Sequence, residues 1–245
     1  MKSITIVAIL ITFWSRSFSQ EPKGTLYLYF NHFSDNEKLG LNDPKAIYHN
    51  ANGDDYKVAV FKYYISNIKL LRKNGRPEIL PSTYFLVDVS DTLTLARKIT
   101  DIPVGEYSGI SFIIGVDSAR NFAGAQADDL DPSRGMFWTW NNGYIFLKFE
   151  GESIKSTARQ HRLTFHIGGV ENPNTIKIFK TELDQPLVVT KEKPAKLEFK
   201  ANVMNLFRGK TVIDFSKLNT VMGGANANII AENYAGNLFE LIVRP

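Results

Sequence analysis

The chain has 245 residues, of which 44% are hydrophobic and 22% are charged, with a formal net charge of +4 and no cysteine. This length can bury one sizeable core, and the lack of cysteine excludes disulfides, thiolate metal sites and cysteine nucleophiles. Lysines and arginines occur in no run longer than two. The sequence therefore gives no stripe of positive charge for a phosphate backbone, and we expect no nucleic-acid partner.

Residues 1–19 predict a secretory signal peptide. A short basic start precedes the apolar run Ile4–Trp14, and small residues follow at Ser17–Ser19. The apolar run is too short to span a bilayer comfortably, and without cysteine no lipid can be attached at the cleavage site. We expect Gln20 to be the first mature residue and residues 20–245 to form a single β domain, periplasmic or secreted, with no membrane span and a net charge of +2.

Runs of β-branched and aromatic residues, separated by Gly, Pro, Asn and Asp, predict strands along most of the chain. The expected strands are 25–30, 58–71, 84–87, 109–116, 144–149, 163–167, 175–179, 186–189 and 197–203. The Asn74-Gly75 turn predicts a hairpin between the second and third of them. Helix is expected only as one or two short helices in long loops, at 119–130, 215–218 or 229–239. The pattern predicts an all-β fold, an antiparallel β-sandwich or barrel-like structure.

Two tryptophans stand two residues apart in the stretch GMFWTWNNGYI, at Trp138 and Trp140. On a strand they would share one face with Met136. Three interpretations remain open: an aromatic-lined core, an aromatic groove for a glycan or peptide, and indoles that are modified or belong to a metal site. Gly135 and Gly143 bracket the pair, which favours a rim or a pocket.

Two of the four histidines, His32 and His166, are the candidate metal ligands, while His49 and His161 stand in loops or out of register. His32 ends the first strand, and His166 precedes Gly168 and Gly169, where the backbone can approach a neighbour closely. A lone histidine on a strand is usually just a polar residue satisfied within the fold. No HExxH, HxH or CxxC motif indicates zinc. Imidazole with thioether ligands, from Met136, Met204 and Met222, suits copper better than calcium or magnesium.

The sequence gives no catalytic constellation. It has no GxSxG motif and no phosphate-binding loop. The acidic stretches 52–55 and 128–131 lack the DxDxDG pattern of calcium loops and are typical of turns. We therefore expect a protein that is not an enzyme.

Several segments together resemble the MbnP-like copper-binding domain family, in the form common in exported proteins of Bacteroidota. They are KYYISNIKL (62–70), YFLVDVSD (84–91), IPVGEYSGISFIIGVDSARN (102–121), LDPSRGMFWTWNNGYIFLKFEG (130–151) and FHIGG (165–169). The resemblance extends from about Gly24 to Phe239. The block around the two tryptophans is specific, whereas the strand segments taken singly are not.

The resemblance implies an exported β-rich protein that binds copper and acts in copper capture or handling. In characterised branches of the family, a tryptophan is oxidised to kynurenine by a partner di-haem enzyme related to MauG, and the kynurenine joins histidines at the copper. Carried over to this chain, Trp138 or Trp140 is the candidate for oxidation. His166 is then the first candidate ligand and His32 the second.

The sequence departs from the family pattern in two places. The four-cysteine motif of some relatives is absent. Many Bacteroidota relatives have a histidine-containing tail after a segment like Asn233–Ala235, whereas here residues 236–245 contain no histidine. Any ligands that such a tail supplies elsewhere are missing from this chain.

Overall fold

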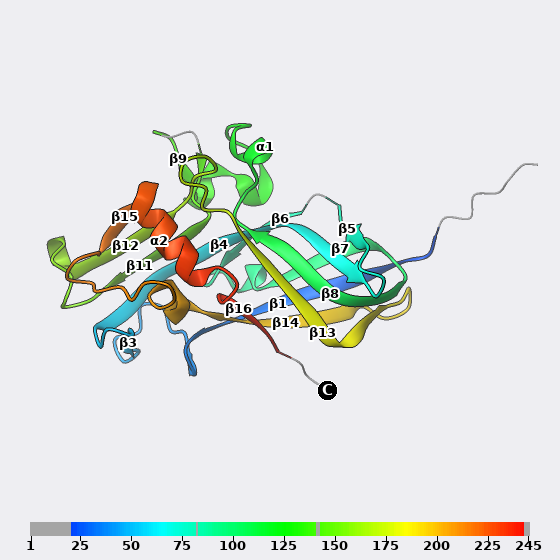
Figure 1. The fold of residues 1–245 in the computed structure, drawn as a ribbon, viewed down its shortest axis with the longest axis horizontal. Helices are drawn as coiled ribbons and strands as arrows, with labels where there is room; N and C mark the ends of the chain where they lie inside the picture. Colours follow the sequence, from blue (N-terminus) through cyan, green and yellow to red (C-terminus); the bar gives the residue numbers. More distant parts are fainter. Residues whose placement is uncertain (1–20, 82, 141–142, 243–245) are drawn as a thin grey trace, which may run out of the picture.

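A computed structural model describes residues 21–81, 83–140 and 143–242, so the expected signal peptide lies outside the described residues. Two sheets pack face to face in a β-sandwich (Figure 1). The smaller sheet has five strands, with β1 pairing with β14, β7 and β2, and β14 with β16. These strands are β1 (Lys23–Ser34), β2 (Glu37–Lys38), β7 (Ala96–Pro103), β14 (Ala195–Asn202) and β16 (Phe239–Ile242).

The larger sheet has nine strands, and six of them lie in the order β13-β8-β4-β11-β12-β15. The other three, β3, β5 and β6, pair with β4, the long strand of this sheet. The nine strands are β3 (Tyr48–His49), β4 (Asp55–Arg72), β5 (Pro77–Ile79), β6 (Tyr84–Asp88), β8 (Gly105–Ile114), β11 (Leu147–Glu152), β12 (Arg162–Ile167), β13 (Lys177–Val189) and β15 (Thr220–Met222).

The expected all-β sandwich is confirmed, but its sheets are mixed rather than purely antiparallel. β1 runs parallel to β14, and β12 runs parallel to β15. Parallel neighbours need a long connection, and here residues 35–194 separate the first pair and residues 168–219 the second. The two strands expected at 175–179 and 186–189 form the single strand β13, which carries a register shift between Glu182 and Leu187.

The helices differ from the expected ones in position. The expected helix at 229–239 begins and ends five residues earlier, as α2 (Gly224–Tyr234), and residues 215–217 form a turn. The helix begins at a pair of glycines, Gly223 and Gly224, which both have positive φ. Because two successive glycines are typical of a turn, the sequence does not predict a helix that begins there. The other helical segments are α1 (Ser118–Asn121), η1 (Thr92–Thr94), η2 (Asp128–Leu130), η3 (Pro132–Arg134), η4 (Arg159–His161) and η5 (Val203–Leu206). None of the helices in the described part of the chain is long and apolar enough to cross a membrane.

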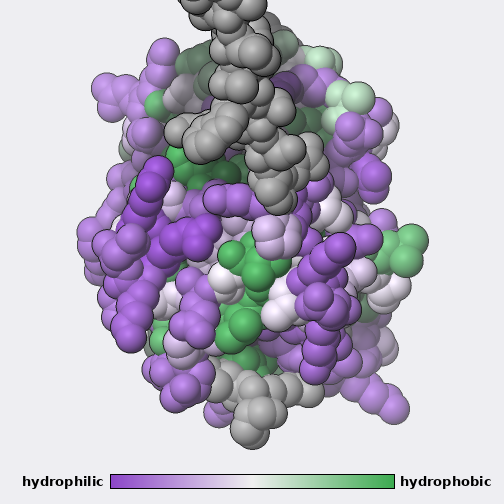
Figure 2. Space-filling model, turned by 90° about the vertical axis from the view of Figure 1, so that its right-hand side faces the viewer, coloured by the Kyte–Doolittle hydropathy of each residue, from purple (hydrophilic) through white to green (hydrophobic). Residues whose placement is uncertain are grey.

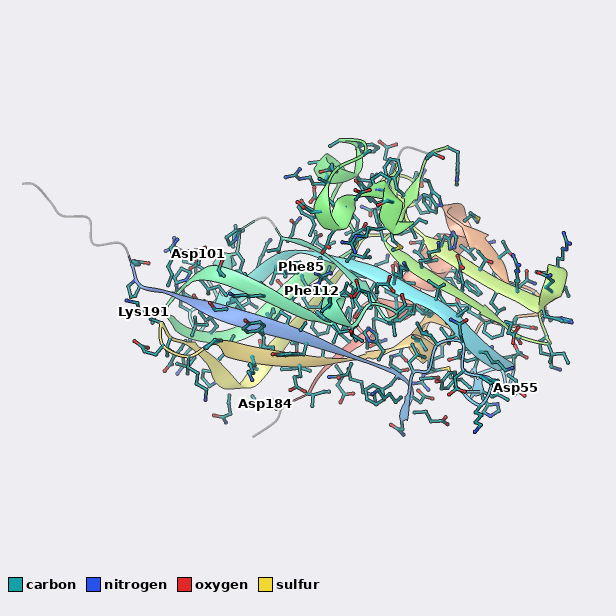
Figure 3. All side chains as sticks on the ribbon, turned by 180° about the vertical axis from the view of Figure 1, so that it is seen from behind. Asp55, Phe85, Asp101, Phe112, Asp184 and Lys191 are labelled. Atoms are coloured by element: carbon teal, nitrogen blue, oxygen red, sulfur yellow. The ribbon has the colours of Figure 1, made fainter. Side chains whose placement is uncertain are left out.

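The main core fills the space between the sheets and is rich in aromatic rings. Phe112 lies near the middle of the sandwich, whereas Asp55 and Asp101 mark its opposite ends (Figure 3). Toward one end Phe207 packs edge-on against its neighbours, with ring centroids 4.9 Å from Phe215 and 5.0 Å from Phe149. Such pairs add to the free energy of burial. At the end near β5 and β7, hydrophobic surface shows mainly as a strip between hydrophilic side chains (Figure 2).

A second, smaller hydrophobic cluster lies on the other face of the nine-stranded sheet. It is formed where residues 117–140 and 143–146, here called the cap, fold over that face. The cap contains α1, η2, η3 and the two-stranded ribbon of β9 (Phe137–Trp138) and β10 (Gly143–Tyr144), which gather above the sheet (Figure 1). The cap positions the tryptophan block over the sheet.

The aromatic core predicts a large effect of one truncation. Phe207→Ala should lower the free energy of unfolding by about 3–5 kcal/mol, because a fully buried ring leaves a cavity. Phe122→Ala is the matched control, since that ring is 60% exposed and surface changes usually stay within about 0.5 kcal/mol. Urea unfolding of both variants checks the prediction. Equal destabilisation by the two variants would contradict it.

Candidate metal centre

The alternation of side chains along β4 decides which residues lie under the cap. Tyr63 belongs to the core between the sheets, whereas the next residue, Tyr64, belongs to the cluster under the cap. Successive side chains of a strand point to opposite faces. On β12 the same rule places Phe165 and Ile167 in the main core and turns His166 outward, toward the cap.

His166 is held on this face by Glu150. On β11, Lys148 lies opposite His166, and on β15 Met222 occupies the same register. The Nε2 atom of His166 is 2.8 Å from Glu150 Oε1. Its Nδ1 atom is buried and has no hydrogen-bond partner among the described residues. The ring therefore has one nitrogen fixed by a carboxylate and one nitrogen free to act as a ligand.

Glu150 is ionised over the physiological range. The hydrogen bond from His166 and the charge of Lys148 lower the pKa of its carboxyl to about 2, against the opposing effect of partial burial. A carboxylate that accepts from Nε2–H fixes the tautomer in which Nδ1 carries the lone pair. This is the usual arrangement around metal-binding histidines. Sequence reasoning missed Glu150, although the alternation in YIFLKFEG places it on one face with Lys148.

Trp138 is only 4% exposed and packs on two glycines near this histidine. A Cβ on Gly168 would lie 2.8 Å from Trp138 Cζ3, and one on Gly223 would lie 3.6 Å from Cη2. The Gly223 N–H donates to the backbone oxygen of His166 at 3.1 Å. The six-membered ring of Trp138 therefore packs on the glycines that flank His166. Its own Nε1 is buried and has no partner in the described part of the chain.

Trp140 leaves the face that it was expected to share with Met136 and Trp138. The strand β9 ends at Trp138, and the chain then turns, so Trp140 is 65% exposed while Met136 is fully buried. The two indoles remain in contact, with centroids 5.4 Å apart and planes inclined by 44°. They are neither two core residues nor a coplanar, exposed platform for a glycan.

The structure does not bring His32 to this place. His32 lies between the two sheets, with its Nε2 3.0 Å from Tyr63 Oη and its ring against Phe61. Burial lowers its pKa to about 3, so the ring is neutral. Because Tyr63 and His166 face opposite sides of the nine-stranded sheet, His32 and His166 cannot share one metal ion in this arrangement. His32 has the surroundings of a satisfied core residue.

The two remaining histidines also lie elsewhere. His49 Nδ1 pairs with Asp55 Oδ1 at 2.6 Å on the surface, and His161 Nδ1 lies 3.0 Å from Ser156 O. Within residues 21–81, 83–140 and 143–242, no three His, Cys, Asp or Glu side chains are grouped so as to hold a metal ion. A metal centre in this part of the chain would therefore need other donors beside His166.

A core role for His32 predicts a pH effect on stability. Burial lowers the pKa of His32 from its ordinary value of 6.5 to about 3. As the pH falls below 6.5, the unfolded chain therefore binds a proton that the folded chain does not, and stability decreases. Between about pH 7.0 and 5.5 this should cost about 1 kcal/mol. His32→Gln, which retains a partner for Tyr63, should remove that part of the slope in urea unfolding of metal-free protein. If the free energy of unfolding changed equally with pH in the variant and in the unmutated protein, this role would be refuted.

The packing of Trp138 on Gly168 predicts an effect of a substitution on stability and on the tryptophan spectrum. Gly168→Ala should displace the indole and lower the free energy of unfolding by about 1–3 kcal/mol, because the added carbon also meets Tyr144 O at 2.5 Å. The displacement should change the near-ultraviolet circular dichroism of the tryptophans. Gly40→Ala is the control, since its new Cβ would lie no closer than 3.3 Å to a neighbour. A spectrum and stability like those of the control would disprove the packing.

Comparison with known proteins gives the family. A search of curated proteins returned no match. Among solved structures, MbnP from Methylosinus trichosporium matches with a TM-score of 0.58 and 13% sequence identity, covering 89% of this chain and 98% of that chain. That likeness shows a shared fold. The model of the MbnP family matches residues 23–223, well over half of the chain, and the protein therefore belongs to the MbnP family.

Proposed function

We propose that this protein is an exported copper-binding protein that acts in copper capture or handling and is not itself an enzyme. The observation that carries the proposal is the state of His166: its Nε2 is bonded to Glu150, while its buried Nδ1 has no partner among the described residues. Membership of the MbnP family supports copper as the metal. Export rests on the signal peptide expected at residues 1–19.

The residues beside His166 fit copper only if donors other than carboxylates take part. Met222 occupies the register position next to His166 on β15, so its thioether lies on the same face. Imidazole nitrogen and thioether sulfur are ligands that copper accepts. The intact indole of Trp138 is a hydrogen-bond donor only, and opening of its ring would expose an aromatic amine at the same place.

Trp138 is the better candidate for oxidation to kynurenine than Trp140. It lies against the glycines that flank His166 and is buried, whereas Trp140 is mostly exposed and contacts Trp138. The conversion breaks the C2–C3 bond of the indole, adds two oxygen atoms from the oxidant, and releases C2 as formate after hydrolysis. The two oxygen atoms come from dioxygen, or from two molecules of hydrogen peroxide with release of water, and the partner di-haem enzyme related to MauG is the catalyst that activates this oxidant.

The test uses protein purified from its native host. Intact mass, peptide mapping across residues 135–148 and metal analysis should show one modified tryptophan, at Trp138, with stoichiometric copper. Trp138→Phe and His166→Gln should each abolish stoichiometric copper, because each removes one donor. Trp140→Phe and His161→Gln are the matched controls and should keep it.

Other results would redirect the assignment. Copper bound to protein with intact tryptophans would indicate a histidine-based site without a tailoring enzyme. Intact tryptophans with no copper, even after incubation with Cu(I) and Cu(II), would refute the copper proposal. They would favour the alternative of a secreted β-sandwich that binds a partner without metal.

A further inference from the structure

Two lysines lie side by side beneath the cap, where like charges are unfavourable. Lys62 on β4 and Lys148 on β11 are register partners, and their side chains are only 21% and 18% exposed. Like charges directly opposite each other destabilise a strand pair, and partial burial adds a desolvation cost. Each ammonium group therefore needs polar partners that offset the repulsion and the desolvation, which a pair of neutral side chains would not need.

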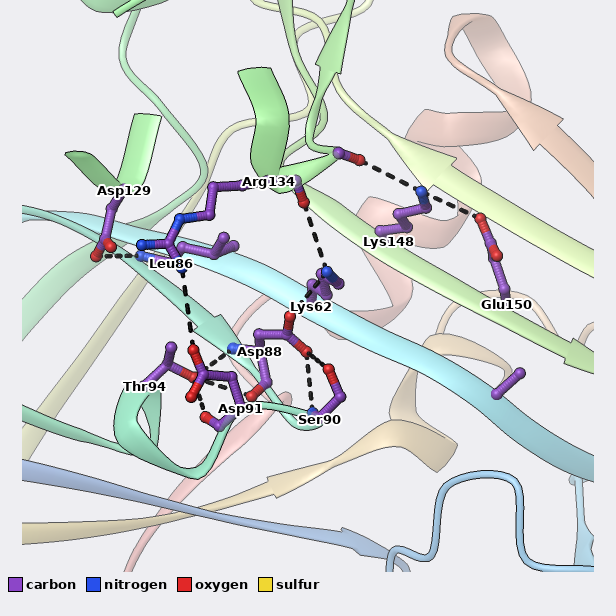
Figure 4. Close-up of polar contacts among 12 residues, drawn as sticks. Lys62, Leu86, Asp88, Ser90, Asp91, Thr94, Asp129, Arg134, Lys148 and Glu150 are labelled. Atoms are coloured by element: carbon purple, nitrogen blue, oxygen red, sulfur yellow. Dashed lines mark hydrogen bonds and ion pairs between the residues drawn. The ribbon is translucent and has the colours of Figure 1, made fainter. Parts of the chain in front are cut away.

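Each ammonium group connects a carboxylate of the sheet to a backbone carbonyl of the cap (Figure 4). Lys62 Nζ is 2.7 Å from Asp88 Oδ2 and 3.5 Å from Arg134 O. Lys148 Nζ is 3.2 Å from Glu150 Oε1 and 3.3 Å from Gly135 O. An ammonium group has three donors and can serve both partners at once. The two carbonyls are successive and lie at the end of η3, where the chain enters the tryptophan block.

The two bridges differ in what lies beyond the carboxylate. The bridge through Lys62 ends at Asp88, whose other carboxylate oxygen accepts from Ser90 Oγ at 2.6 Å. The bridge through Lys148 continues, because Glu150 Oε1 also accepts from His166 Nε2 at 2.8 Å. Only this second bridge links the segment that carries Trp138 to the imidazole ring.

We propose that Lys148 is a positioning residue that fixes the His166 ring and the segment bearing Trp138 in one relative geometry. Gly135 lies three residues before Trp138, and its left-handed φ of 72° makes it the C-cap that ends η3. Lys148 holds this carbonyl and at the same time orients the carboxylate that selects the His166 tautomer. As a statement about metal binding, the inference rests on the proposed function.

Lys148→Met tests the link, and Lys62→Met is the matched control because it removes an equivalent cap contact without touching Glu150. In metal-free protein at neutral pH, nitrogen-15 NMR reports the tautomer of His166 and the environment of the Trp138 indole N–H. Lys148→Met should mix the two His166 tautomers and shift the Trp138 signal, while Lys62→Met should retain a single tautomer. Lys148→Arg, which keeps the charge and the donors, should restore the single tautomer.

Copper affinity of the protein from the native host gives a second readout. Lys148→Met should weaken binding by roughly 10–100-fold, as expected for the loss of an outer partner of a ligand, with a smaller loss in Lys62→Met. A single tautomer and an unshifted Trp138 signal in Lys148→Met would overturn the proposal. If Lys148→Met does not fold, Lys148→Gln replaces it. If the unmutated protein binds no copper, the proposed function fails and the tautomer comparison alone decides the role of Lys148.

Discussion

The nine-stranded sheet is buried over much of both faces, and this constraint organises the rest of the molecule. One face packs on the five-stranded sheet, and the other carries the cap. The strand β4 pairs with β3, β5, β6, β8 and β11, so its alternation sorts side chains between the two clusters for its neighbours as well. A shift of one residue in its register would exchange the contents of the two faces.

Under the cap, charged and polar side chains of the sheet are partly shielded from solvent. Such groups are stable only when they are paired, and most of them are. The exceptions in the described part of the chain include His166 Nδ1 and Trp138 Nε1, which lie within one small region. A buried polar atom without a partner costs about 1–3 kcal/mol, and here that cost falls on the two side chains to which we assign the proposed copper binding and indole oxidation.

The environments of the two buried histidines show how burial and pairing lead to different roles. His32 has an aromatic surrounding and a tyrosine hydroxyl, and its lowered pKa keeps it neutral as part of the core. His166 has a carboxylate on one nitrogen and nothing in the described chain on the other. The first arrangement completes a core, whereas the second leaves a ring nitrogen without a hydrogen-bond partner.

The sequence by itself determined the all-β class, most strand positions and the resemblance to the family, because strand alternation and short motifs are local properties. It also gave His166, His32, Trp138 and Trp140 as candidate site residues, and their part in metal binding stays a prediction. It did not determine the start of α2 after two glycines, the single strand β13, the exposure of Trp140 or the role of Glu150. Nor did it show that His32 and His166 lie on opposite sides of the nine-stranded sheet. Those features depend on which strands become neighbours and in what register. Such contacts join residues far apart in the chain, so they form only when the other sheet and the cap pack on the two faces of the nine-stranded sheet.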